Sequence, residues 1–247
     1  MYLTIHLPRL LKYLFAAAGI ALLIHTFGAA ADSLHTDAVS LAAQPPSMTL
    51  IIDAGHGGED GGALAHSGTK ESELNLDIAL RVEALAHFCG LQTVMTRTND
   101  QIAYPDDAST TAARKLADQK QRIALINSID NACLLSIHQN KYSTPAPRGP
   151  QVLYAATDGS HQFGSLTQQN LTAVLYPDNI RSEIEIPSGI YLFKKVRCPA
   201  ILVECGFLSN PTECTLLEDP QYRLKTATVL AASCIQYCNT TRSADDI

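Results

Sequence analysis

The chain has no tryptophan, few aromatic residues (6%) and no excess of positive charge. Its formal net charge of −6 gives no electrostatic reason to expect a nucleic-acid partner. No Cys-x-x-Cys pair occurs, which argues against a cysteine zinc knuckle. Apolar residues make up 46% of the chain and charged residues 17%, a balance typical of globular proteins rather than disordered ones. The length of 247 residues fits one or two domains.

The first thirty residues have a composition of their own. Arg9 and Lys12 precede an apolar stretch over residues 13–24, and residues 28–31 offer a small-x-small cleavage pattern, the layout of a secretory signal peptide. The alternative is an uncleaved membrane anchor, but the stretch is shorter than the ~20 residues of a typical span and His25 interrupts it. In both cases we expect the rest of the chain to be exported to the cell envelope, with membrane contact only through residues 1–31.

The remaining chain divides into three parts. Residues 32–47 are rich in alanine, serine and proline and are predicted to be a linker. Residues 48–238 show regular patterns and are predicted to form one folded domain. Residues 239–247 are polar and are predicted to be a disordered tail.

Short apolar runs alternate with segments of helical periodicity. Strands are predicted at residues 48–53, 91–96, 133–137, 151–155, 190–193 and 200–203, and helices at 70–89, 112–129, 162–175, 211–217 and 221–237. Thr69 is predicted to cap the first helix and Gly90 to end it. Because the strands are continuously apolar and alternate with helices, the fold class is predicted to be an α/β three-layer sandwich, with a mostly parallel twisted sheet and helices on both faces.

The chain has seven cysteines, an odd number. Cys133 and Cys205 lie in or beside apolar runs and are predicted to be small core residues. An exported protein can form disulfides, but the spacing of the other cysteines assigns no partners.

Three polar side chains follow predicted strands at their carboxyl ends, where sites gather in open α/β sheets. His56 lies in a glycine-rich turn after the first strand, His138 follows residues 133–137, and Glu204 follows residues 200–203. Glycines let the chain turn sharply and keep bulky side chains away from a site. Each histidine alone is more often structural, so the interpretation depends on the convergence of all three.

Acidic residues have competing explanations. Burying Glu204 without a partner is costly, so either a metal or a salt bridge with Arg122 or Arg181 is expected. Glu71 lies in the first turn of its helix, where the helix dipole alone favours a carboxylate. Other residues that compete for a ligand role are Glu59, Glu73, His66 and His161, and the two histidines are left out because they lie in polar loops.

Two imidazoles and one carboxylate form the ligand set that catalytic zinc uses, with one position left open. A zinc ion there polarises a carbonyl, and a second carboxylate then acts as general base. The sequence supplies enough groups for both roles.

Four motifs, in this order, resemble those of the zinc-dependent N-acetylmuramoyl-L-alanine amidases. They are DAGHGGEDGGA at 53–63, ESELNL at 71–76, SIHQN at 136–140 and VECGFLSN at 203–210. The likeness covers residues 48–237, and the departures are small: Ala54 stands where proline is common and Ser72 where lysine is common.

The resemblance implies one zinc ion held by His56, Glu71 and His138, with Glu204 as catalytic general base. It implies hydrolysis of the amide between N-acetylmuramic acid and L-alanine of the peptidoglycan stem peptide. In some relatives a lipoprotein activator is needed for zinc loading. The single catalytic domain and the segment RGPQVLY at 148–154 look like the spore-cortex branch, which prepares muramic δ-lactam formation during sporulation in the forespore intermembrane space.

Three alternatives remain open at this point. A zinc carboxypeptidase acting on the stem peptide would use the same ligands and base. An inactive cell-wall-binding descendant is disfavoured because both histidines and both key acids are present. A structural envelope protein without metal is the third.

Overall fold

The structure is a computed structural model that describes residues 48–178 and 180–245. The predicted leader and linker therefore lie outside the described residues. Within the described part, no helix has the length and apolarity needed to cross a bilayer.

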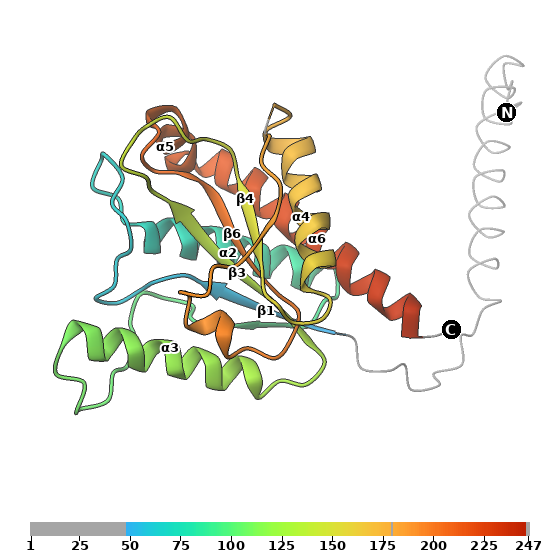
Figure 1. The fold of residues 1–247 in the computed structure, drawn as a ribbon, viewed down its shortest axis with the longest axis horizontal. Coiled ribbons are helices and arrows are strands. Elements are labelled where there is room, and N and C mark those ends of the chain that lie inside the picture. The colour runs from blue at the N-terminus through green and yellow to red at the C-terminus, as the bar shows by residue number, and fades with distance from the viewer. Residues whose placement is uncertain (1–47, 179, 246–247) are drawn as a thin grey trace, which may run out of the picture. The chain divides into compact units, whose positions relative to one another are not determined.

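One mixed sheet forms the centre of the fold (Figure 1). Its six strands lie in the order β2-β1-β3-β6-β4-β5. Their bounds are β1 (Thr49–Ala54), β2 (Thr93–Met95), β3 (Ala132–Asn140), β4 (Gln151–Tyr154), β5 (Ile184–Glu185) and β6 (Ala200–Phe207). Neighbouring strands are parallel except for β4 against β6. The prediction of a mostly parallel sheet is confirmed.

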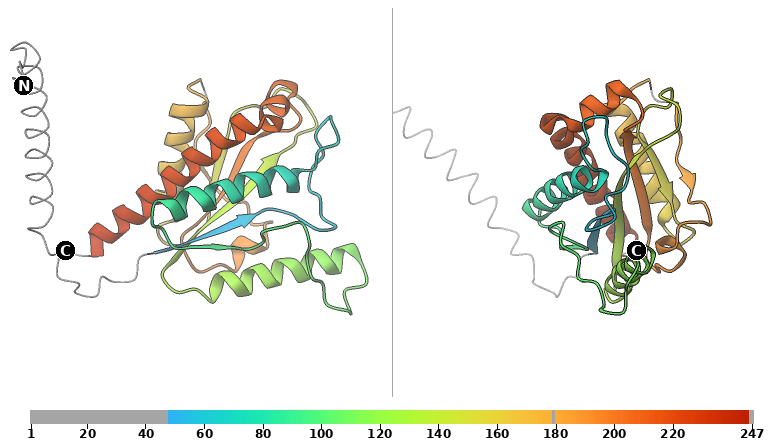
Figure 2. Two further views of the ribbon diagram at one scale, coloured as in Figure 1. Left: turned by 180° about the vertical axis from the view of Figure 1, so that it is seen from behind. Right: turned by 90° about the vertical axis from the view of Figure 1, so that its left-hand side faces the viewer.

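Helices cover both faces of this sheet, which confirms the predicted three layers. They are α2 (Glu71–Phe88), α3 (Thr111–Asn127), α4 (Ser160–Leu175), the 3₁₀ helix η1 (Leu192–Lys194), α5 (Pro211–Glu218) and α6 (Pro220–Asp245). Buried residues of α2, α4, α5 and α6 form one apolar cluster with the sheet, and those of α3 and η1 form another. Figure 2 shows α2, α5 and α6 on one side of the strands and η1 on the other.

Strand side chains alternate between these two clusters. In β1, Leu50 and Ile52 join the larger cluster and Ile51 the smaller, and all three are fully buried. A strand covered on both faces needs apolar residues at every position, which explains the continuous apolar runs of the sequence.

A bulge in β6 changes which residues share a face. His138 lies opposite Glu204, but Asn140 lies opposite Phe207, so β6 contains one extra residue. Residues two apart in a strand share a face, as do residues in register on neighbouring strands. Glu204 and Phe207 therefore lie on the same face as His138, the face covered by α3 and η1.

Several local predictions are wrong. The strand predicted at 190–193 is instead η1, where Leu192 and Phe193 are both buried against the sheet. Thr69 does not cap α2: Lys70 is the N-cap residue and makes no side-chain cap, while Thr69 Oγ1 bonds the Ser67 hydroxyl. Both errors have the same origin. A short apolar run can form a strand or a buried 3₁₀ turn, and a threonine before a helix can bond the helix or a neighbouring side chain.

The predicted boundaries of two strands and of the tail also need correction. β3 and β6 extend to Asn140 and Phe207, so His138 and Glu204 lie within strands rather than after them. The tail predicted to be disordered from Asn239 is helical to Asp245, as the end of α6. No proline or glycine interrupts it, and the Thr240 hydroxyl bonds the carbonyl of Gln236 one turn earlier.

The cysteines are all free in the described residues. Cys133 and Cys205 are buried core residues, as predicted. The sulfur atoms of Cys133 and Cys238 lie 3.7 Å apart between β3 and α6, without a covalent bond.

A buried ion pair lies beneath the carboxyl ends of the strands. Asp53, at the end of β1, is 2% exposed and accepts hydrogen bonds from Arg122 Nη1 (2.6 Å), Ser136 Oγ (2.6 Å) and Thr96 Oγ1 (2.8 Å). Burial alone would raise the pKa of Asp53, but the Arg122 guanidinium and the hydrogen bonds outweigh it and lower this pKa to about 2.

We predict that Asp53→Asn lowers the free energy of unfolding by about 3 kcal/mol, because it leaves the Arg122 charge buried beside a neutral amide. Urea denaturation measures this loss. The matched control is Asp77→Asn, whose carboxylate pairs with Arg81 and Arg223 but is 35% exposed. It should cost less than about 1 kcal/mol. Equal effects of the two variants would contradict the structural role of the buried pair.

The same pair predicts a pH dependence. A carboxylate whose folded pKa of about 2 lies below its ordinary 3.8 stabilises the protein fully above the ordinary value and loses that stabilisation as the pH falls through the folded pKa. The stability difference between the native chain and Asp53→Asn should therefore shrink by about 2 kcal/mol between about pH 5 and about pH 2. Denaturation at both pH values measures it, and a constant difference would refute the assigned pKa.

Candidate active site

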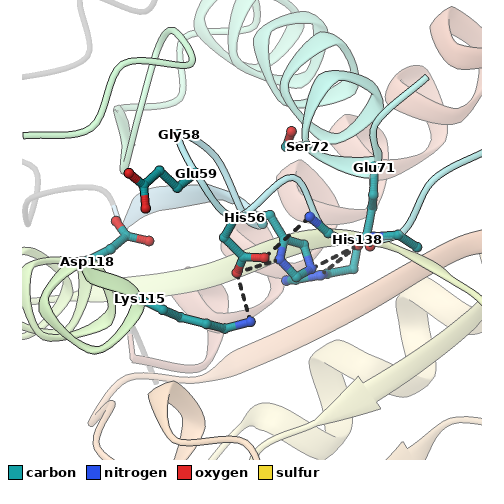
Figure 3. Close-up of polar contacts among 12 residues, drawn as sticks. His56, Gly58, Glu59, Glu71, Ser72, Lys115, Asp118 and His138 are labelled. Carbon is teal, nitrogen blue, oxygen red and sulfur yellow. Dashed lines mark hydrogen bonds and ion pairs between the residues drawn. The ribbon is translucent and has the colours of Figure 1, made fainter. Parts of the chain in front are cut away.

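The structure brings together two histidines and a glutamate from three elements (Figure 3). His56 lies in the loop after β1, Glu71 begins α2, and His138 lies in β3. His56 Nε2 is 3.3 Å and His138 Nδ1 is 3.1 Å from Glu71 Oε1, and one ligand atom from each residue lies within 4.8 Å of the others. Among the described residues, this is the one group of at least three metal-ligating side chains so arranged.

The donor set fits a zinc ion. Bonds of about 2.0–2.1 Å to nitrogen and oxygen at tetrahedral angles separate the ligand atoms by about 3.3 Å. The observed separations of 3.1 and 3.3 Å from the shared Glu71 oxygen agree with that value. Two neutral imidazoles with one carboxylate are also the ligand chemistry of catalytic zinc sites.

Glu71 is fixed by groups other than the histidines. The backbone N–H groups of Ala63 (2.9 Å) and Gln139 (3.1 Å) and the Asn75 amide (3.3 Å) all donate to its carboxylate. Burial alone would raise the pKa of Glu71, but its bonds with His138 and His56 lower this pKa below the ordinary value. Glu71 is therefore an ionised carboxylate at neutral pH, held at one position.

His56 is held in an unusual backbone conformation. Its φ of 60° lies in the left-handed region, which non-glycine residues rarely adopt. The neighbouring glycines leave space for the other two side chains: a Cβ on Gly55 would lie 2.3 Å from the His138 ring, and one on Gly62 would lie 2.6 Å from Glu71 Oε2. The glycine-rich motif thus leaves room for His56, Glu71 and His138 to approach one another.

Asp60 and Lys115 orient His56. Asp60 Oδ2 lies 3.0 Å from His56 Nδ1 and 2.8 Å from Lys115 Nζ, which extends from α3 (Figure 3). Burial alone would lower the pKa of His56, but Asp60 and Glu71 raise it to about 9. In the neutral form of the ring, a carboxylate on Nδ1 keeps the proton on that nitrogen and leaves the Nε2 lone pair directed toward Glu71.

Glu204 lies in β6 directly opposite His138 in β3. Its Oε2 is buried and has no hydrogen-bond partner. Burial raises the pKa of Glu204 to about 7, since the opposing attraction of His138 is partly offset by repulsion from Glu71. The alternative of a salt bridge with Arg122 is wrong, because Arg122 pairs with Asp53 and Asp118.

A cavity of about 230 Å³ joins these groups. His56, His138 and Glu204 line it together with Leu192 and Phe193 of η1. The cavity therefore combines apolar side chains with two histidines and an acid whose pKa is raised, an arrangement suited to hydrolysis.

The competing residues lie elsewhere. Glu73 is exposed, Glu59 forms an ion pair with Arg114, and His66 is exposed. His161 is also exposed and lies 3.4 Å from Glu183. Leaving His66 and His161 out of the site agrees with these positions.

Sequence reasoning missed Asp60 and Lys115. Asp60 follows His56 by four residues within the same glycine-rich turn, and this spacing is the signal that could have identified it. Lys115 carries no such signal, because α3 is brought to the site only by the tertiary fold.

Comparison with known proteins places these residues in a family. The family model of N-acetylmuramoyl-L-alanine amidases (Amidase_3) matches residues 50–236. A germination-specific N-acetylmuramoyl-L-alanine amidase of Bacillus subtilis is 32% identical over 195 residues, covering 76% of this chain and 78% of that protein. The amidase AmiA of Escherichia coli is 27% identical over 223 residues, covering 76% of this chain and 75% of the relative.

Solved structures agree. The CwlD amidase of Clostridioides difficile, determined in complex with the GerS lipoprotein, has a TM-score of 0.74 and 33% identity, covering 78% of this chain and 99% of that one. An N-acetylmuramoyl-L-alanine amidase from Clostridium difficile 630 has a TM-score of 0.67 and 27% identity, covering 79% and 98%. The motifs, the fold and these relatives together show that the chain belongs to the N-acetylmuramoyl-L-alanine amidases and acts on peptidoglycan.

Proposed function

We propose that this amidase is a zinc enzyme in which His56, Glu71 and His138 hold the metal and Glu204 is the general base. The observation that carries the proposal is the meeting of one ligand atom from each of the three residues within 4.8 Å. When bound, zinc polarises the scissile carbonyl and stabilises the negative charge that develops on its oxygen.

Glu204 moves the proton in this scheme. It accepts a proton from the attacking water, whose oxygen forms a bond to the lactyl carbonyl carbon of N-acetylmuramic acid. It then donates that proton to the nitrogen of L-alanine as the amide C–N bond breaks. The products are a muramic carboxyl group and a free stem peptide. A general base works best with a pKa near the operating pH, and the pKa of about 7 for Glu204 fits that requirement.

We extend the proposal to the biological setting. The germination-specific relative supports a place in the spore-cortex branch, where peptide removal precedes muramic δ-lactam formation. The complex of the C. difficile relative with a lipoprotein supports a lipoprotein partner for this chain as well. Residues 1–31 would export the enzyme as a signal peptide or anchor, residues 32–47 would link it to the catalytic domain from residue 48, and the forespore intermembrane space would be its site of action.

We predict that purified peptidoglycan treated with the zinc-loaded enzyme releases peptides that begin with L-alanine and leaves peptide-free glycan. Chelation should abolish the release and added zinc should restore it, since the polarising cation is lost and regained. Mass spectrometry of the digest and metal analysis measure both effects. Products shortened at the carboxyl end of the stem peptide would instead identify a carboxypeptidase, and zinc bound without turnover would identify a wall-binding descendant.

We predict that Glu204→Gln retains zinc but loses turnover by at least ~100-fold, because the amide cannot accept the proton. Metal content and initial rates on peptidoglycan are the two measurements. Near-normal activity in a folded Glu204→Gln protein would rule out the general-base role.

We predict that His138→Ala weakens zinc binding, because it removes one ligand of three. His161→Ala is the matched control, since that histidine is exposed and lies outside the site. Zinc titration should show a loss of affinity for the first variant and none for the second. Full zinc occupancy in His138→Ala at a stoichiometric zinc concentration would remove His138 from the ligand set.

A further inference from the structure

A second polar region adjoins the active site across the sheet. Gln151 of β4 lies directly opposite Glu204 of β6, which in turn lies opposite His138 of β3. The three side chains therefore form a row on one face, perpendicular to the strands. The row runs from a proposed zinc ligand, through the proposed base, toward the sheet edge at β5.

Arg181 lies over the far end of this row. Its Nη1 donates to Gln151 Oε1 at 3.1 Å, and its Nε donates to the carbonyl of Arg148 at 2.9 Å. Its guanidinium also lies 4.7 Å from the centre of the Phe207 ring. Because of the bulge in β6, Phe207 shares the face of Glu204. Arg181 is thus held against two residues near Glu204: Phe207, further along β6, and Gln151, on the neighbouring strand β4.

Arg148 and Arg181 line one cavity of about 560 Å³ together with Gln151 and Tyr176. The Arg148 guanidinium lies 5.9 Å from the centre of the Tyr176 ring. Asp178 is the acidic residue in the lining. Two guanidinium groups therefore face this cavity, and a second carboxylate, the buried Glu213, lies close enough to attract both of them.

We propose that this cavity binds a carboxylate of the stem peptide and that Arg181 determines the preference for it. Guanidinium groups bind carboxylates through charge-assisted hydrogen bonds. Adjacent strands are about 4.8 Å apart and an extended peptide advances about 3.3 Å per residue. The cavity beside β4 therefore lies within one or two residues of a bond cleaved beside Glu204.

At this distance from the cleaved bond, the cavity is expected to contact the residue that follows L-alanine in the stem peptide. In peptidoglycan that residue is a D-glutamate joined through its side-chain carboxyl group. Its α-carboxyl group is therefore either a free anion or, where the wall is amidated, a neutral carboxamide. Guanidinium groups distinguish these two forms, because a carboxamide oxygen accepts a weaker hydrogen bond from them than a carboxylate does, and the carboxamide NH₂ group is repelled by a cation.

The assignment rests on the proposed amidase function, and the test separates the two. Two muropeptides that differ only in this carboxylate or carboxamide are cleaved by the zinc-loaded full chain, and kcat/KM is measured for each. The native chain should prefer the carboxylate by about tenfold or more. Arg181→Gln should bring the ratio close to one, Arg181→Lys should retain part of the preference, and Arg197→Gln, an exposed arginine before the amino end of β6, should retain all of it.

The ratio is measured within one protein sample, so partial misfolding of a variant does not change it. Equal kcat/KM values for the two substrates in the native chain would overturn the subsite while leaving the amidase function intact. An unchanged preference in Arg181→Gln would also overturn the role of Arg181. Cleavage of neither substrate by the native chain would overturn the proposed function and the subsite with it.

Discussion

The carboxylate of Glu71 is the point on which the active site depends. Its Oε1 is within 3.3 Å of a ring nitrogen from each histidine, and it is held from behind by the N–H groups of Ala63 and Gln139. A buried carboxylate is costly unless its oxygens are hydrogen-bonded or paired. Here those bonds come from a loop, a strand and, through Asn75, the same helix. Because the buried Glu71 carboxylate needs these hydrogen bonds, it fixes the loop, the strand β3 and the helix α2 relative to one another.

Two buried arginines hold the loop that carries His56. Arg97 donates to the carbonyls of Ala54 and Gly55, and Arg122 donates to those of Ala54 and His56. These carbonyls leave the sheet as the chain turns, so the sheet no longer satisfies them. The arginines replace the missing sheet bonds and stabilise the left-handed backbone of His56. Backbone strain at His56 is thus compensated by charge-assisted hydrogen bonds from the two arginines.

The sequence identifies the elements and the main site residues but not their relative geometry. Apolar periodicity predicts the order of strands and helices. The predicted strand-end positions of His56, His138 and Glu204 anticipate their convergence, because neighbouring parallel strands run in the same direction and end at one edge, although the strands that contain His138 and Glu204 continue past them. The bulge in β6 carries no local signal, since it depends on register with β3. Lys115 is likewise invisible in the sequence, because nothing near it in the chain indicates a contact with Asp60. Strand register and helix packing depend on residues far apart in the chain, so local sequence patterns do not predict them.

One face of the sheet changes from apolar to polar along the strands, and this change determines the environment of Glu204. Next to the site, Leu202 is buried in the same apolar cluster as Leu192 and Phe193 of η1. One pair of residues further along β6, Glu204 is left with an oxygen that has no partner, which conflicts with the usual rule for buried polar groups. Conflicts of this kind are expected at functional sites, where the group is kept for a reaction rather than for stability. Burial raises the pKa of Glu204 to about 7, and the sheet holds it opposite His138. The packing that disfavours its charge thus gives Glu204 the pKa that the proposed general base requires.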